Sequence, residues 1–158
     1  MPEVYSFRTI PAKILLPIDF SPSSHTALER ATELAKYFHA DLYLVHVVHP
    51  DGNTEELRKE AADNLAKSAA GLAAKGVKAV CSVETDEDIA SCLIDVAERE
   101  KVDMIVISSH GTTGWHPIVF GSIAEKVLRL AHIPVLLNRT EKPESSVKLK
   151  SGRLMEWW

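Results

Sequence analysis

Short apolar runs alternate with longer segments of helical spacing along most of the chain. The runs are nearly continuous in apolar residues, which is typical of strands covered on both faces, and they lie at residues 13–18, 41–48, 77–83, 102–107 and 134–137. Four intervening segments repeat apolar residues every three or four positions, at residues 22–38, 54–75, 89–97 and 122–131. This alternation predicts an α/β fold, an open five-stranded parallel sheet with helices on both faces.

Polar and glycine residues gather after the first and fourth predicted strands. Asp19 and Ser21 follow the first strand, and the segment 108–114 follows the fourth. In open parallel sheets, ligands bind past the carboxyl ends of the strands, where the direction of winding reverses. We therefore expect these two strands to be neighbours, which gives a Rossmann-like sheet of order 3-2-1-4-5.

Residues that favour helix starts precede the helical segments. Ser21 is expected to be an N-cap, with Pro22 as the first helical residue. Capping-box patterns begin at Thr85 (Thr-x-x-Asp) and at Ser122 (Ser-x-x-Glu), so we expect Ser122 to cap the last helix. In the long helix, Leu57 begins an apolar series that is expected to face the core.

Length and charge narrow the class of protein. A chain of 158 residues is expected to form one domain with its own core. Its net charge of −4 argues against nucleic acid as a partner, and no apolar run approaches the ~20 residues of a membrane span. Cys81 and Cys92 lack metal-type companions and are expected to be buried thiols. The start of the chain lacks the features of a signal peptide, so we expect a cytoplasmic protein.

The chain divides into a leader at 1–11, a domain at 12–139 and a C-terminal extension at 140–158 that ends in two tryptophans. Two interpretations of the extension remain open, a loose tail or a segment docked on its own domain or on a second subunit. Two interpretations of the apolar stretch 115–120 are also left open, packing beneath a loop or a surface for a partner or lid.

The segment after the fourth strand has the composition of an anion site. Gly111, Gly114 and Gly121 form a loop that leads into a helix, an arrangement that aims backbone N–H groups and a helix dipole at one place. Phosphate is the usual ligand of such a site, although similar glycines also close plain connections. The loop has no Gly-x-x-x-x-Gly-Lys-Ser/Thr pattern.

Asp19 is either a helix-start carboxylate or a ligand group at the same edge of the sheet.

Five stretches together resemble the universal stress protein family. They are Lys-Ile-Leu-Leu-Pro-Ile-Asp-Phe-Ser at 13–21, His-Val-Val at 46–48, Ser-His-Gly at 109–111 followed after nine residues by Gly-Ser at 121–122, Ala-Glu-Lys-Val at 124–127 and Ile-Pro-Val-Leu-Leu at 133–137. The resemblance covers residues 12–139. It implies a Rossmann-like fold and a homodimer formed through the fifth strand, residues 133–138. The C-terminal extension, outside the resemblance, is a further candidate for this contact.

Members of this family that bind ATP carry Gly-x-x-Gly, nine residues, then Gly-Ser/Thr. Here Gly111, Gly121 and Ser122 match, whereas Ser108 stands at the first glycine. Serine fits there without strain if the backbone angle φ is negative. Because the preceding strand ends at Ile107, we expect Ser108 to have a negative φ.

The resemblance also implies a set of ligand-binding residues. Those expected to border adenine and ribose are Pro17, Ile18, Asp19, Val47, Ile107 and Ser108, with Asp19 accepting from a sugar hydroxyl. Those expected to offer N–H groups to the phosphates are Gly111, Gly121, Ser122, Ile123 and Ala124. The implied cofactor is ATP, or AMP or ADP, with Mg²⁺ held mainly by phosphate oxygens and water.

The leading hypothesis is an adenine-nucleotide-binding sensor or regulator of the stress response that acts as a homodimer. We expect at most slow ATP hydrolysis, because the phosphate loop has no arginine finger. The alternative is a nucleotide-free family member that acts through protein contacts, with Trp115, Phe120 and the extension as surfaces. A third class, a nucleotidyl-transfer enzyme, is disfavoured because its His-x-x-His signature is missing after the first strand.

Overall fold

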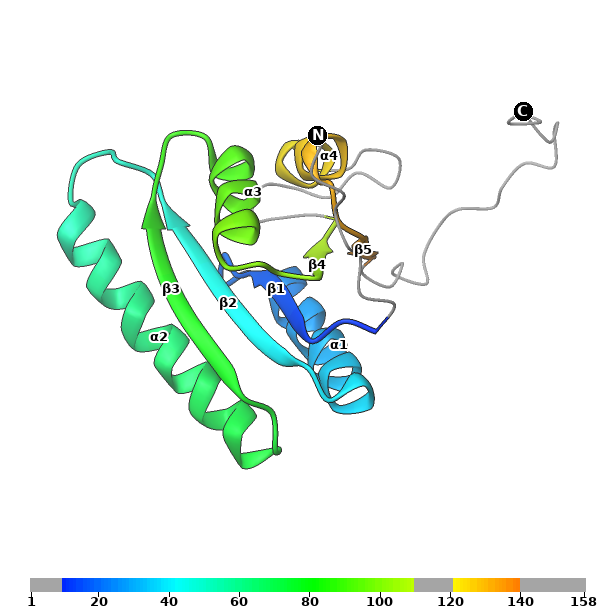
Figure 1. Ribbon diagram of the computed structural model, residues 1–158. Helices are drawn as coiled ribbons and strands as arrows, with labels where there is room; N and C mark the ends of the chain where they lie inside the picture. Colours follow the sequence, from blue (N-terminus) through cyan, green and yellow to red (C-terminus); the bar gives the residue numbers. More distant parts are fainter. Residues whose placement is uncertain (1–9, 110–120, 140–158) are drawn as a thin grey trace, which may run out of the picture.

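The computed structural model of the chain describes residues 10–109 and 121–139. Within them, Figure 1 shows a central sheet flanked by helices. The strands are β1 (Lys13–Pro17), β2 (Asp41–Val48), β3 (Ala79–Thr85), β4 (Met104–Ser108) and β5 (Val135–Asn138). The helices are α1 (Pro22–Phe38), α2 (Thr54–Ala74), α3 (Ile89–Arg99) and α4 (Ser122–Leu130).

All strand pairs in the sheet are parallel, and the strand order is β3-β2-β1-β4-β5. Both the α/β class and the predicted order are therefore confirmed. β1 lies directly beside β4, with Leu15 opposite Ile105. The carboxyl ends of these two strands consequently meet at one edge of the sheet, where the winding reverses.

Side chains of successive strand residues enter two separate cores, one on each face of the sheet. Leu16 of β1 and Leu44 of β2 belong to the core covered by α1 and α2. Leu15 and Val45, their neighbours in sequence, belong to the core covered by α3 and α4. Figure 1 shows the two helix pairs on opposite faces. Burial on both faces explains why these strands are apolar almost without interruption.

The beginnings of three helices agree only in part with the predicted caps. The Ser21 hydroxyl accepts the Ser24 N–H at 3.2 Å and Pro22 is the first residue of α1, as expected. At α3, the N-cap is Asp88, which accepts the Ser91 N–H at 3.2 Å, so the prediction of a cap at Thr85 is wrong. Thr85 remains in β3, which continues to that residue.

The predicted cap at Ser122 is also wrong. α4 begins at Ser122, and its N-cap is Gly121, which has no side chain to accept a hydrogen bond. A tertiary contact explains the shift by one residue, because the Gly121 N–H donates to the carbonyl oxygen of Ser109 at 2.7 Å. This bond sets the point at which the chain turns into the helix.

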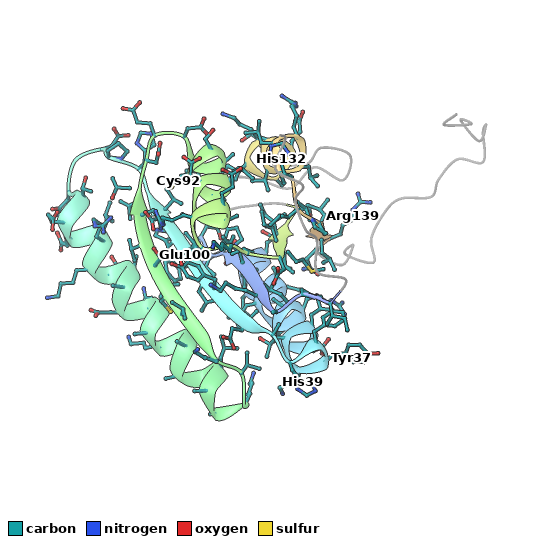
Figure 2. All side chains as sticks on the ribbon, in the orientation of Figure 1. Tyr37, His39, Cys92, Glu100, His132 and Arg139 are labelled. Atoms are coloured by element: carbon teal, nitrogen blue, oxygen red, sulfur yellow. The ribbon has the colours of Figure 1, made fainter. Side chains whose placement is uncertain are left out.

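Two side chains that were expected to be buried are exposed. Leu57 is 44% exposed and lines a surface groove together with Phe20 and His49. Cys81 is exposed on the edge strand β3, whereas Cys92 is buried on α3 (Figure 2). Burial raises the pKa of the Cys92 thiol to about 11. Among the described residues, no helix combines the length and the apolar character needed to cross a membrane.

α2 provides a stability test with a matched control. Leu65 is fully buried between α2 and the sheet, so Leu65→Ala should lower the free energy of unfolding by about 2–5 kcal/mol. The same change at exposed Leu57 should cost less than about 1 kcal/mol. Urea denaturation of both variants measures the difference, and equal losses would contradict the described position of α2.

Asp88 links the beginnings of α3 and α4. Its carboxylate pairs with the Lys126 ammonium group and accepts from the Ser91 hydroxyl at 2.8 Å. Hydrogen bonds lower the pKa of Asp88 from 3.8 to about 2. The bond from Lys126 has the largest effect, and the bonds from Ser91 have the next largest. Because its pKa is lower in the folded state, the ionised carboxylate stabilises the folded protein at pH values above the unfolded-state pKa. This contribution is lost as the pH falls and the carboxylate is protonated.

The pH dependence of stability should therefore change in Asp88→Asn. The melting temperature of the unchanged protein should decrease as the pH falls from about 4 to about 2. The melting temperature of the variant should decrease less over the same interval. Asp95→Asn, also on α3, should keep the steeper dependence. Melting curves at several pH values provide the measurement, and parallel pH profiles for all three proteins would refute the role of Asp88.

Candidate functional site

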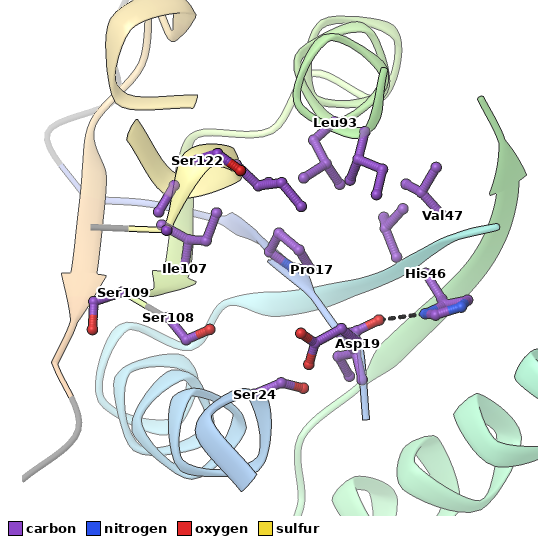
Figure 3. A pocket seen from close by; sticks show the side chains of 16 residues that line it. Pro17, Asp19, Ser24, His46, Val47, Leu93, Ile107, Ser108, Ser109 and Ser122 are labelled. Carbon is purple, nitrogen blue, oxygen red and sulfur yellow. Dashed lines mark hydrogen bonds between the residues drawn. The ribbon is translucent and has the colours of Figure 1, made fainter. Parts of the chain in front are cut away.

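A cavity of about 220 Å³ opens at the carboxyl ends of β1, β2 and β4 (Figure 3). Ten of the eleven predicted site residues line it, and they are Pro17, Ile18, Asp19, Val47, Ile107, Ser108, Gly121, Ser122, Ile123 and Ala124. The eleventh, Gly111, lies outside the described residues, as does the stretch 115–120. The sheet order brings these residues together from four separate parts of the chain, and their ligand-binding roles stay predictions.

The turn after β1 is held in place by β2. The Ile18 N–H donates to the carbonyl oxygen of Val45 at 2.8 Å, and His46 Nδ1 lies 2.6 Å from the carbonyl oxygen of Ile18. Since a carbonyl oxygen only accepts, Nδ1 of His46 carries the proton in this bond. Phe20 then adopts a left-handed backbone conformation, with φ of 62°, and its ring lies 4.9 Å from that of His46. A non-glycine residue in this conformation is uncommon and depends on such surroundings.

This turn places the Asp19 carboxylate at the rim of the cavity. Asp19 Oδ1 accepts the Ser21 N–H at 2.9 Å, which ties the carboxylate to the beginning of α1. Asp19 is the only Asp, Glu, Lys or Arg among the described residues that line the cavity. The α1 side of the cavity therefore attracts hydrogen-bond donors and repels anions.

The opposite side of the cavity is formed by the beginning of α4. Ser109 donates its N–H to the carbonyl oxygen of Asn138 at 3.0 Å and accepts from Gly121, which connects α4 to both β4 and β5. In the first turn, the N–H groups of Ser122, Ile123 and Ala124 have no intrahelical acceptor. No side chain caps this end within the described ranges. N–H groups without an intrahelical acceptor and the helix dipole favour an anion here.

Ser108 occupies the end of β4, between these two sides. It is the last residue of the strand and lies opposite Asn138 of β5. Among the described residues, the positive φ angles outside glycine occur at Phe20, His39 and Lys101. Ser108 therefore has a negative φ, as expected, and its backbone does not require glycine.

An apolar wall separates the two polar sides. Val45 and Val47 of β2, with Ile89 and Leu93 of α3, contribute most of it, and Ile107 of β4 completes it. Such a wall accommodates a flat apolar ring. The cavity as a whole can thus hold a molecule that combines a ring, neutral polar groups and an anionic group.

Sequence reasoning missed several lining residues, of which Ser24 is the most informative. Ser24 lies on the same face of α1 as Ala27 and Ala31, and all three are buried. A serine at an apolar position of an amphipathic helix was the available signal. Ile89 and Leu93 belong to the apolar series of the predicted helix at 89–97, but helical spacing does not distinguish a cavity wall from a filled core.

Comparisons with known proteins agree on one family. The model of the universal stress protein family matches residues 12–139. A universal stress protein of Methanocaldococcus jannaschii is 35% identical over 145 residues, which cover 84% of each chain.

Two solved structures of similar fold contain nucleotides. One is the universal stress protein from Archaeoglobus fulgidus in complex with dAMP, 24% identical, with a TM-score of 0.65 over 81% of this chain and 98% of that one. The other is a universal stress protein in complex with cAMP, 20% identical, with a TM-score of 0.68 over 84% of this chain and all of that one. These two likenesses establish the shared fold.

The backbone at Ser108 can be tested by substitution. Because φ is negative there, Ser108→Gly gains no relief of strain and should lower the free energy of unfolding by about 0.5–1 kcal/mol. Lys101→Gly is the control and should raise the free energy of unfolding, because Lys101 has φ of 52° and glycine adopts that angle freely. Chemical denaturation compares the two, and stabilisation by Ser108→Gly would show that a positive φ is required at this position.

Proposed function

Because the chain belongs to the universal stress protein family, we propose that its cavity binds an adenine nucleotide and that the bound nucleotide regulates its part in the stress response. The site residues carried over from the family resemblance are the basis of this proposal. Ten of them surround a single cavity, and the dAMP and cAMP complexes of similar fold are consistent with such a ligand.

The observation that carries the proposal is the beginning of α4, which no side chain of residues 10–109 or 121–139 caps. Gly121 supplies no side-chain acceptor, and three N–H groups follow it at the cavity wall. A phosphate group would accept from these N–H groups and take the place of a cap. The Ser122 hydroxyl, which is on the same wall, adds a further donor.

The other parts of the nucleotide follow from the position of the phosphate. The apolar wall between β2 and α3 would hold the adenine ring, with Val47 against its face. Asp19 would accept from a ribose hydroxyl at the rim. This orientation keeps the phosphates away from the Asp19 carboxylate, which would repel them.

Charge bears on the choice of nucleotide. The described lining residues include no Lys or Arg, and the sequence of residues 110–120 contains none either. Among the described residues, helix N–H groups and hydroxyls would therefore meet the phosphate charge. We propose that ATP binds with Mg²⁺ on its phosphates, and that AMP and ADP, which carry less charge, are also ligands.

We further propose a cytoplasmic homodimer. β5 is an edge strand of the described sheet, and an edge strand can pair with a second copy, here through residues 133–138. The C-terminal extension at 140–158, which would add to this contact, lies outside the described residues.

Thermal shift with nucleotide tests the proposed function. Millimolar ATP with Mg²⁺ should raise the melting temperature, and Gly121→Val should remove this rise because a branched side chain would enter the phosphate position. Gly71→Val is a matched control, since an added Cβ at Gly71 meets nothing within 4 Å and this residue does not line the cavity. It should retain the full ligand-induced shift.

Two results would contradict the proposal. Absence of stabilisation by ATP, ADP and AMP in the unchanged chain would favour a family member that acts without nucleotide. Retention of the full shift in Gly121→Val would show that the phosphates bind elsewhere.

A further inference from the structure

Ser24 has a buried hydroxyl group that the fold itself does not use. The residue is 2% exposed, and its Oγ atom has no hydrogen-bond partner within the described part of the chain. The backbone of Ser24 is fully engaged in the start of α1, since its N–H donates to the Ser21 hydroxyl. Leaving a buried hydroxyl without a partner is unfavourable, so a serine here calls for an explanation.

The cavity provides an explanation for this serine, because Ser24 is part of the cavity wall. Figure 3 shows Ser24 and Asp19 on the side of the cavity away from Ser122. Both residues are tied to Ser21, whose N–H donates to the Asp19 carboxylate and whose hydroxyl accepts the Ser24 N–H. The two side chains therefore form one rigid unit at the beginning of α1.

Their combined chemistry selects one kind of ligand group. An ionised carboxylate only accepts hydrogen bonds, whereas the Ser24 hydroxyl can donate one. A ligand hydroxyl can donate to Asp19 and accept from Ser24 at the same time. A phosphate oxygen cannot, because it has no proton to donate and is repelled by the Asp19 charge. The unit therefore fits an alcohol group and not an anion.

We propose that Ser24 acts with Asp19 as a sugar-recognition unit that makes the cavity selective for ribonucleotides over deoxyribonucleotides. This inference rests on the proposed nucleotide function and adds to it a specificity-determining residue. A deoxy analogue leaves the Ser24 hydroxyl unpaired, whereas a ribose hydroxyl satisfies it. Sites built around such a bond discriminate against ligands that lack the group.

The test is isothermal titration calorimetry of the full chain with ATP, 2′-deoxyATP and 3′-deoxyATP, each with Mg²⁺. The unchanged protein should bind ATP about five- to tenfold more tightly than the analogue that lacks the recognised hydroxyl. Ser24→Ala should weaken ATP binding by about the same factor and leave the affinity for that analogue within about twofold.

Stability separates this role from a structural one. Ser24→Ala removes a buried hydroxyl that has no partner among residues 10–109 and 121–139, so the melting temperature of the variant should be unchanged or higher. Ser23→Ala is the matched control, since Ser23 is in the same turn but does not line the cavity. It should preserve the discrimination between ATP and the deoxy analogues.

The outcomes distinguish this inference from the function on which it rests. If the unchanged chain binds ATP and both analogues with equal affinity, or if Ser24→Ala keeps the original ratio, sugar recognition by Ser24 is wrong and nucleotide binding stands. If ATP, ADP, AMP and the deoxy analogues all fail to bind, both proposals are wrong. Because the affinity ratio of the unchanged chain is itself a test, the inference can be refuted even if the variant fails to fold.

Discussion

The hydrogen bond from the Gly121 N–H to the carbonyl oxygen of Ser109 determines the geometry on which the site depends. It joins the end of β4 to the beginning of α4 and makes Gly121 the N-cap. As a result, the first N–H groups of α4 meet no side-chain acceptor among the described residues at the cavity wall. If the helix began one residue later with Ser122 as its cap, the serine hydroxyl would satisfy one of these groups and weaken the anion site.

The strand order places the beginning of α4 at the cavity. Because β1 lies between β2 and β4, the Asp19 turn and the beginning of α4 face one cavity from opposite sides. One side carries a carboxylate and a buried hydroxyl, and the other carries the partial positive charge of a helix. A nucleotide has the matching polarity, with neutral hydroxyls at the sugar and negative charge at the phosphates. The separation of charge in the cavity thus fixes the orientation proposed for the ligand.

Much of this arrangement could be predicted from the sequence, because local patterns specify it. The apolar runs predicted the strands, and the polar residues after the first and fourth runs predicted their adjacency. Contacts that depend on tertiary structure could not be predicted in this way. The cap of α4 is set by Ser109, far from Gly121 in the chain, and a capping-box pattern at Ser122 carries no information about that contact. Leu57 has the spacing of a core residue but faces a groove with Phe20. The unpartnered hydroxyl of Ser24 is evident only from atomic positions.

The central claim is that backbone N–H groups at the beginning of α4 bind the phosphates of an adenine nucleotide. Amide chemical shifts measured by NMR during titration with ATP and Mg²⁺ test it most directly. The account predicts that the largest shift changes occur at the amides of Gly121, Ser122, Ile123 and Ala124, and that they saturate together with smaller changes near Asp19 and Val47. Saturable binding that leaves the amides of α4 unchanged, or no binding at all, would contradict it.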